Sequence, residues 1–329
     1  MKIIYALAAL FLLSLPSCEQ ETVSNPNEVF DDFWTFVDEN YIFMEDKNID
    51  WDSVYRVYQP LAAQSSSEQQ LFDVCSNALL ELKDGHSSLQ SEFANSPIYD
   101  YREGYDIHFS FDVVESNYLS SPAEQSGSLY YSKIGSTGYI YFERMNRYGS
   151  FNNIVSQMID EGITGLIIDL RDNGGGDSNP VPKMLSEYVD ERTLLGSYIE
   201  KTGPGRRDVT EPLPVFANPG NEPIDIPIVA IINRNGYSAT SYFSAMLSAL
   251  PNVRLVGQKT GGGAGGNYGY QLINGWIIKV SVSDFLDYNN ETIELGVDPD
   301  IVIENTESDI LNNQDKMLEK AIEVLEGLS

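Results

Sequence analysis

The sequence predicts an α/β protein in which a sheet-and-helix core follows a smaller helical segment. Apolar residues recur at three- and four-residue intervals over residues 27–83, which is typical of amphipathic helices. After Gly138, short runs of Ile, Val and Leu alternate with helical patterns, and this alternation is the signature of an α/β domain. A chain of 329 residues has room for both parts.

The first part is predicted to be a small N-terminal helical domain over residues 28–86. One helical run covers residues 29–37 and a second covers residues 69–82, with a turn at residues 48–52 between them. The dipeptide Asp84-Gly85 is a turn signal that ends this domain.

Residues 87–132 predict short strands and loops, because they are rich in Ser, Tyr and Asp and alternate around Tyr105 to Val114. They carry no clear PDZ pattern. The α/β domain is predicted over residues 133–329, and residues 268–282 read as a hairpin turning at Asn274-Gly275. The other predicted strands are residues 139–142, 165–170, 226–232, 253–256 and 301–303, and the predicted helices are residues 151–159, 180–189, 238–250 and 308–328.

The charge of the chain excludes one class of partner. Lys and Arg number 20 against 49 Asp and Glu, which gives a formal net charge of −29. Such a surface repels phosphate backbones, and no basic stripe compensates for it, so no nucleic-acid binding is expected.

The N-terminus has the pattern of an export signal. Met1-Lys2 precedes the apolar stretch Ile3 to Leu15, and the following Leu15-Pro16-Ser17-Cys18 resembles the lipobox of bacterial lipoproteins. The resemblance implies a signal peptide over residues 1–17, lipidation of Cys18, a tether over residues 18–27, and a membrane-anchored protein in the bacterial cell envelope, periplasmic or surface-exposed. The alternative is an ordinary signal peptide with an incidental cysteine.

Neither a disulfide framework nor a metal centre is predicted. Cys75 lies in an apolar helical pattern and has no partner if Cys18 is acylated, so we expect a buried thiol. The two histidines, His86 and His108, do not have metal-ligand spacing, and no cofactor is expected.

Ser238 is a candidate nucleophile because it stands where a buried strand turns into a helix. Apolar residues at Tyr242, Phe243, Met246 and Leu247 define one face of that helix. Free N–H groups and the positive end of the helix dipole gather at its start, where they can stabilise an oxyanion. The alternative is that Ser238 only caps the helix.

Three further segments could complete such a site. Asp169 to Asp177 follows a buried strand and contains three consecutive glycines, which allow a close backbone approach, although the segment could also be a loose turn. His86 lies on a turn between the two predicted domains, whereas His108 lies in a strand-like pattern, so His86 is the better candidate base. The segment from Ile293 to Asp300 offers Glu294 as a carboxylate that could orient an imidazole, or it is a plain turn.

In order, these segments resemble the C-terminal processing (tail-specific) serine peptidases, on the branch close to the tricorn protease core and the interphotoreceptor retinoid-binding protein. That branch carries five motifs: D-G-H-[ST], D-x-R-x-N-G-G-G, N-R-x-x-x-S-A, N-G-W and G-[VI]-x-P-D. They match Asp84 to Ser87, Asp169 to Gly176, Asn233 to Ala239, Asn274 to Trp276, and Gly296 to Asp300. The resemblance implies a crotonase-like ββα spiral core that carries a serine hydrolase site.

Residue by residue, the resemblance implies that Ser238 is the nucleophile, His86 the general base and Glu294 the distal carboxylate. Ala239 and Gly175 match the oxyanion-hole donors. The branch with a Ser-Lys dyad has its lysine at the position that Gly263 occupies here, and Lys259 lies at a different offset. A lysine base is therefore not predicted.

The expected function is a lipid-anchored envelope serine endopeptidase that cleaves peptide or protein substrates through an acyl-enzyme. Since Glu294 would lie beside the ring in a strongly anionic protein, we also expect a raised pKa for His86. Two alternatives remain. One is a non-catalytic binding lipoprotein on the same fold, and the other is a crotonase-type acyl-CoA enzyme, against which the export signal argues.

Overall fold

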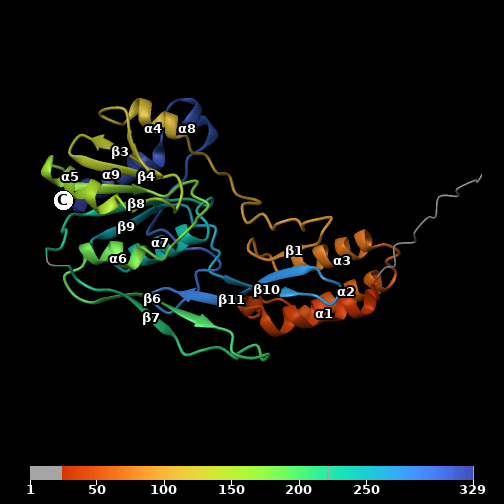
Figure 1. The fold of residues 1–329 in the computed structure, drawn as a ribbon. Coiled ribbons are helices and arrows are strands. Elements are labelled where there is room, and N and C mark those ends of the chain that lie inside the picture. The colour runs from red at the N-terminus through yellow and green to blue at the C-terminus, as the bar shows by residue number, and fades with distance from the viewer. Residues whose placement is uncertain (1–23, 221, 329) are drawn as a thin grey trace, which may run out of the picture.

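Two β-sheets and the helices packed on them make up the fold of the computed structural model, which describes residues 24–220 and 222–328 (Figure 1). The larger sheet has the strand order β12-β9-β8-β5-β4-β3-β2, and its strands from β4 to β12 run parallel. Its strands are Glu124–Ser126 (β2), Leu129–Ile134 (β3), Thr137–Phe142 (β4), Gly165–Asp169 (β5), Ile228–Ile232 (β8), Val253–Gly257 (β9) and Ile301–Val302 (β12). The predicted mixed α/β class is confirmed.

Helices cover both faces of the larger sheet, which explains why its central strands are apolar throughout. In β5, Leu166 and Ile168 point into a core shared with α5 (Phe151–Asp160) and α7 (Ala239–Ser248). Ile167, between them, points to the opposite face and packs with residues of α9 (Lys316–Leu328). Strands buried on both faces read as continuous hydrophobic runs rather than as alternating ones.

The second sheet links this core to the N-terminal helices. Its central strand β11 (Ile277–Leu286) pairs antiparallel with β10 (Gly266–Gln271) and β1 (Ser88–Gln90) along its first part. From Ser283 onward it pairs with β6 (Thr193–Glu200), and β6 pairs in turn with β7 (Leu213–Ala217). In Figure 1, β11 accordingly spans the middle of the molecule and β10 reaches the helices on the right.

The two helical runs predicted within residues 28–86 are present as the first and last of four helical elements, and the two elements between them were not predicted. The four elements are Pro26–Asn40 (α1), Ile42–Met44 (η1, a 3₁₀ turn), Trp51–Ala63 (α2) and Glu68–Leu80 (α3). Side chains of Asn25, Asp50 and Ser67 cap the three α-helices at their N-termini. Because α1 begins at Pro26, the last residues of the predicted tether are helical.

Several predicted boundaries and elements are wrong in detail. Residues Phe111–Asn117 form a helix (α4) rather than a strand, because the Ser110 hydroxyl caps the free N–H of Val113. The predicted boundary at residue 132 falls inside β3, which pairs with β4. Strands β6 and β7 were not predicted. The predicted helix 180–189 consists of Val181–Leu185 (α6) and the 3₁₀ turn Ser186–Tyr188 (η2), and the helix 308–328 is broken into Glu307–Leu311 (α8) and α9.

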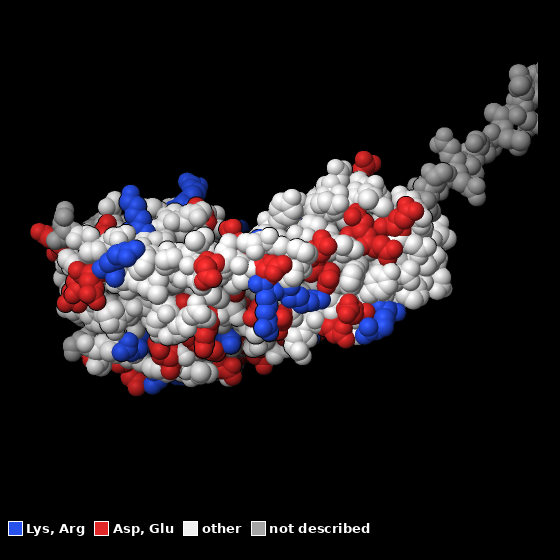
Figure 2. All heavy atoms as spheres, turned by 90° about the horizontal axis from the view of Figure 1, so that it is seen from below, with Lys and Arg blue, Asp and Glu red and all other residues white. Residues whose placement is uncertain are grey.

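The surface agrees with the acidic composition. On the face drawn in Figure 2, Asp and Glu side chains are spread over the whole molecule, and Lys and Arg lie scattered among them rather than in a stripe. No helix within the described residues is long and apolar enough to span a membrane. The predicted signal peptide and Cys18 lie outside the described residues.

Candidate active site

Ser238 occupies a strained turn between β8 and α7 and does not cap the helix. Its backbone has φ 56° and ψ −126°, a region that non-glycine residues rarely adopt, and its side chain makes no capping hydrogen bond. A conformation of this kind costs about 1–3 kcal/mol and persists only where the surrounding structure imposes it. The sharp strand-to-helix turn presents the hydroxyl instead of using it as a cap, as in nucleophile elbows.

Hydrogen bonds to the loop after β5 impose this turn. The side-chain amides of Asn233 and Asn235 both donate to the Asp172 carboxylate, at 2.8 and 2.7 Å. The Tyr237 N–H donates to the Asn173 carbonyl at 3.2 Å. The predicted motifs Asp169 to Gly176 and Asn233 to Ala239 are therefore two halves of one hydrogen-bonded unit.

A fully buried ion cluster anchors the loop after β5. Arg171 donates to both oxygens of Asp169, at 2.8 and 2.5 Å, and to both oxygens of Asp315, at 2.8 Å each. All three side chains are inaccessible to solvent. Within the family-like motif, Asp169 and Arg171 thus have a structural role that the sequence did not reveal, and Asp315 ties the loop to the start of α9.

Gly175 lies against Ser238, and its N–H has a hydrogen-bond partner in the same loop. A Cβ at Gly175 would lie 2.9 Å from the Cβ of Ser238 and 3.0 Å from the Ala239 nitrogen. The Gly175 N–H donates to the Asn173 side-chain carbonyl at 3.0 Å in this structure, and the role of Gly175 as an oxyanion donor stays a prediction. Ala239 is the first residue of α7, and its N–H has no acceptor within the helix.

His86 lies beside the elbow that carries Ser238. The centroid of its ring is 4.9 Å from that of Tyr237, the residue before Ser238. The backbone N–H of His86 donates to the Asp84 carboxylate at 2.7 Å. The same carboxylate also accepts from the hydroxyls of Ser87 and Ser281, at 3.1 and 2.8 Å. His108, the alternative histidine, is half-buried, and its carbonyl accepts from the Asn305 side chain.

The imidazole of His86 is in a state suited to a base. Its Nδ1 is buried and has no hydrogen-bond partner among the described residues. Burial lowers the pKa of His86 below its usual 6.5, and the Lys47 ammonium acts in the same direction, while Asp84 opposes them. The prediction of a raised His86 pKa is therefore wrong, because desolvation outweighs the acidic surroundings.

Glu294 is buried at the site but has partners other than the imidazole. One of its oxygens forms an ion pair of 2.6 Å with Lys47, and the other accepts from the Ala264 N–H at 2.8 Å. Burial raises the pKa of Glu294 to about 7, against the lowering effect of Lys47. The role of Glu294 as the carboxylate that orients His86 stays a prediction, and in this structure Asp84 is the carboxylate bonded to the turn of His86.

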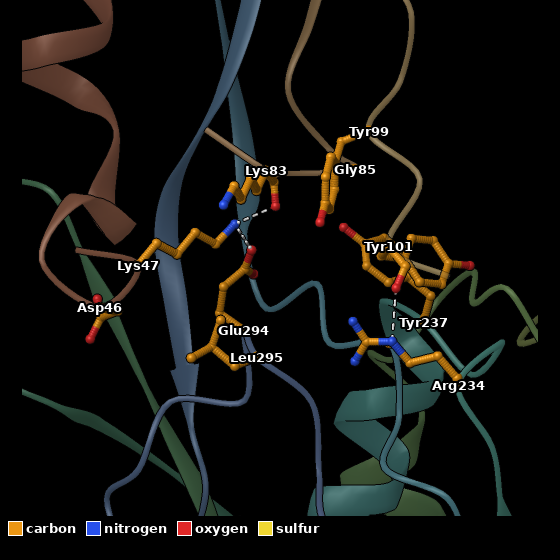
Figure 3. A pocket seen from close by; sticks show the side chains of 11 residues that line it. Asp46, Lys47, Lys83, Gly85, Tyr99, Tyr101, Arg234, Tyr237, Glu294 and Leu295 are labelled. Atoms are coloured by element: carbon orange, nitrogen blue, oxygen red, sulfur yellow. Dashed lines mark hydrogen bonds and ion pairs between the residues drawn. The ribbon is translucent and has the colours of Figure 1, made fainter. Parts of the chain in front are cut away.

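A pocket of about 260 Å³ opens beside these groups (Figure 3). Tyr101 and Tyr237 form one of its walls, stacked with ring centroids 4.0 Å apart and planes 9° from parallel. Lys47 and Glu294 face them from the other side. Lys259 does not line this pocket, and its ammonium pairs with Asp298 at the surface, 3.1 Å away.

The glycine run at residues 261–266 joins the elbow to the Glu294 segment, a role that the sequence did not indicate. The Gly262 carbonyl accepts from the Ser238 N–H at 2.8 Å, and the Gly263 N–H donates to the Glu294 carbonyl at 3.2 Å. A Cβ at Gly262 would lie 1.9 Å from the Glu294 carbonyl oxygen, and one at Gly263 would meet the Tyr237 ring. These contacts require glycine, because they leave no space for a side chain.

Ser238 does not cap its helix, stands at a strained strand-to-helix turn, and follows the tyrosine whose ring contacts the half-buried His86. This is the arrangement expected of a serine hydrolase on an α/β fold. Comparison with known proteins agrees with this class. The sequence profile of Peptidase family S41 matches residues 136–303, about half of the chain, and that of the Tricorn protease C1 domain matches residues 23–79. The chain belongs to peptidase family S41, and the family resemblance predicted from the motifs is confirmed.

Individual relatives support this membership. The chain is 32% identical to the tricorn protease of Thermoplasma volcanium over 197 residues, which are 58% of this chain and 17% of that protein. It is 26% identical to the carboxyl-terminal-processing protease of Synechocystis over 58% of this chain and 44% of that one. The chain thus spans less than half the length of these relatives.

Solved structures extend the likeness to nearly the whole chain. A Parabacteroides merdae protein classed as a peptidase is 34% identical, has a TM-score of 0.84, and is matched over 92% of this chain and 97% of its own. The photosystem II D1 C-terminal processing protease matches over 92% of this chain and 98% of its own, with a TM-score of 0.54. At 16% identity, that second match shows a shared fold alone.

Proposed function

We propose that this protein is a serine endopeptidase in which Ser238 attacks the scissile carbonyl and His86 accepts its proton. The observation that carries the proposal is the geometry of Ser238. Its hydroxyl does not cap α7, and it stands at a strained turn directly after Tyr237, whose ring contacts His86. The N–H of Ala239, at the start of α7, would bind the oxyanion. His86 would give this proton to the leaving amine as the peptide bond breaks and the acyl-enzyme forms. Water would then attack the acyl-enzyme while His86 takes its proton, and His86 would return that proton to the Ser238 oxygen.

The surroundings of the His86 imidazole support its assignment as the general base. A general base must be neutral to accept a proton, and the lowered pKa of His86 keeps the imidazole neutral at physiological pH. In a neutral imidazole one ring nitrogen carries a proton and the other can accept one. The Nδ1 of His86 has no hydrogen-bond partner among the described residues, so it is open to either role. We retain Glu294 as a carboxylate that stabilises the imidazolium, acting within the buried network rather than by a direct bond.

The substrate class and the location follow from the family and the N-terminal signal. Because proteins named as proteases dominate the relatives, we propose a peptide or protein substrate. We further propose that Cys18 carries a lipid anchor in the bacterial envelope. The two sheets, with α7 between β8 and β9, also support a crotonase-like core behind a helical domain of residues 28–86.

Hydrolysis of an unstructured polypeptide by the purified protein tests the proposal. Wild-type protein should cleave it, and Ser238→Ala should reduce the rate to background with an unchanged melting temperature. Lys259→Ala should cleave at the wild-type rate, because its ammonium is paired at the surface with Asp298. Equal cleavage by wild type and Ser238→Ala would overturn the proposal.

A further inference from the structure

Lys47 is a buried cation to which the sequence analysis assigned no role. It follows the 3₁₀ turn Ile42–Met44 in the N-terminal region, and its side chain is 6% exposed. Its ammonium lies 5.7 and 5.6 Å from the ring centroids of Tyr41 and Phe43. Since an isolated buried charge is costly, the protein must compensate for this one with specific partners.

The partners come from both sides of the candidate site. The Lys47 ammonium pairs with the Glu294 carboxylate at 2.6 Å and donates to the Tyr41 hydroxyl at 2.9 Å. It also donates to the carbonyls of Leu82 and Lys83, at 3.3 and 3.0 Å. Figure 3 shows it between the carbonyl of Lys83 and the carboxylate of Glu294.

Two of these acceptors belong to the residues just before Asp84, Gly85 and His86. The position of the imidazole depends on this turn, because the backbone N–H of His86 donates to the Asp84 carboxylate. The Tyr41 hydroxyl, which accepts from Lys47, itself donates to the Leu82 carbonyl at 3.4 Å. Lys47 is therefore connected to the turn of His86 by two routes.

Charged groups from several elements face this network. Asp84 raises the pKa of both His86 and Glu294, whereas Lys47 lowers both. Asp284 in β11 faces Glu294, and burial raises its own pKa to about 8. The phenol of Tyr237 faces Glu294 and Asp84 from the elbow.

We propose that Lys47 is a positioning residue, whose ammonium holds the turn that carries His86 and the buried carboxylate of Glu294 at one fixed separation. The inference rests on the proposed function in taking His86 as the base. It assigns the N-terminal helical region a direct part in arranging a site whose nucleophile comes from the α/β core. Lys47 also counteracts the effect of burial on the pKa of Glu294.

A histidine titration by NMR tests this role without requiring activity. The chain has two histidines, so the ring signals of His86 can be assigned with a His108→Gln variant. Lys47→Met should raise the pKa of His86 by about half a pH unit, because it removes a repelling charge and releases the turn, while the pKa of His108 should not change. The rate of Ser238 labelling by a fluorophosphonate at pH 6 should fall by up to about threefold, the largest change that a half-unit shift in pKa makes in the neutral fraction of His86.

Two further variants keep the test decisive. Lys83→Met removes one positive charge from the same pocket without breaking the network, so His86 should titrate as in the wild type. The double variant Lys47→Met/Glu294→Gln removes both partners of the buried ion pair, and it should shift the pKa of His86 in the same direction if Lys47→Met alone does not fold.

An unchanged His86 titration in a folded Lys47 variant would overturn the inference, and so would an equal shift in Lys83→Met. Absence of labelling in the wild type would instead count against the proposed function, while the titration would still decide the role of Lys47.

Discussion

The α-carbon of Gly175 packs against the side chain of Ser238. A Cβ added at Gly175 would lie 2.9 Å from that of Ser238 and 2.6 Å from the Tyr237 carbonyl oxygen, and the φ of Gly175 is +97°. Space and backbone conformation thus both require glycine at this position. The glycine run of the Asp169 to Gly176 motif therefore sets how closely its loop approaches the nucleophile.

Gly175→Ala should therefore reduce the rate of Ser238 labelling by about tenfold or more, since the added methyl group displaces the elbow. Gly174→Ala is the matched control, because a Cβ there meets no atom within 4 Å and its φ is not positive. Labelling rates measured by intact-protein mass spectrometry should separate the two variants. Equal rates would show that the close contact is not needed.

The pH dependence of labelling should reflect the ionisation of the half-buried His86 imidazole. His86 accepts a proton only when neutral, so the rate should rise with pH through its pKa. Because burial lowers this pKa, the midpoint should lie below about 6.5, the value of an unperturbed histidine. Labelling rates between pH 4.5 and 8.5 measure the midpoint.

The His108→Gln variant should give the same acidic limb as the wild type. Glu294, whose pKa is about 7, changes charge in the same range, so Glu294→Gln identifies its contribution. A midpoint above 6.5 that persists in Glu294→Gln would contradict the proposed environment of His86.

The Arg171 cluster should be a main source of stability. Replacing Arg171 with Met leaves Asp169 and Asp315 buried without their counter-charge, so we expect a loss of about 3–5 kcal/mol in the free energy of unfolding. Chemical denaturation measures this loss. Arg56→Met, which breaks a solvent-exposed pair with Asp50, should cost less than about 1 kcal/mol. Similar losses in the two variants would contradict the structural role of the cluster.

Cys18 should determine where the protein resides. If it carries lipid, wild-type protein expressed in a bacterial host should sediment with membranes, and Cys18→Ala should become soluble or remain unprocessed. Cys75→Ala is the control with the same chemical change, since Cys75 is buried in α3 and should not affect partitioning. Membrane association that survives Cys18→Ala would show that the lipobox prediction is wrong.

The features that could be predicted from the sequence were those that depend on the local spacing of apolar residues. The turn at Ser238 could be predicted because the apolar spacing of α7 begins directly after a buried strand. The helical segment before Asp84 could likewise be predicted from its apolar residues at three- and four-residue intervals. Several motifs that seemed separate in the sequence, such as those of Asp172 and Asn233, turned out to be hydrogen-bonded to each other.

Other features depend on contacts that no local pattern records. Lys47 lies in a polar stretch and acquires its role only through Glu294, far along the chain. The pKa of His86 was predicted in the wrong direction because its burial results from several elements meeting. The Gly175 N–H donates to the Asn173 side chain two residues earlier, a contact that the glycine run itself does not indicate. The strand pattern near Tyr105 was overridden by the Ser110 cap of α4.

The most direct test of the central claim is to map the fluorophosphonate adduct on the folded wild-type protein by peptide mass spectrometry. We expect a single adduct on Ser238 that is absent in Ser238→Ala and retained in Ser241→Ala, whose hydroxyl is buried against Thr260. An adduct on another residue, or equal labelling of Ser238→Ala, would contradict the assignment of the nucleophile. A folded wild type that is not labelled at all would favour a binding protein over a peptidase.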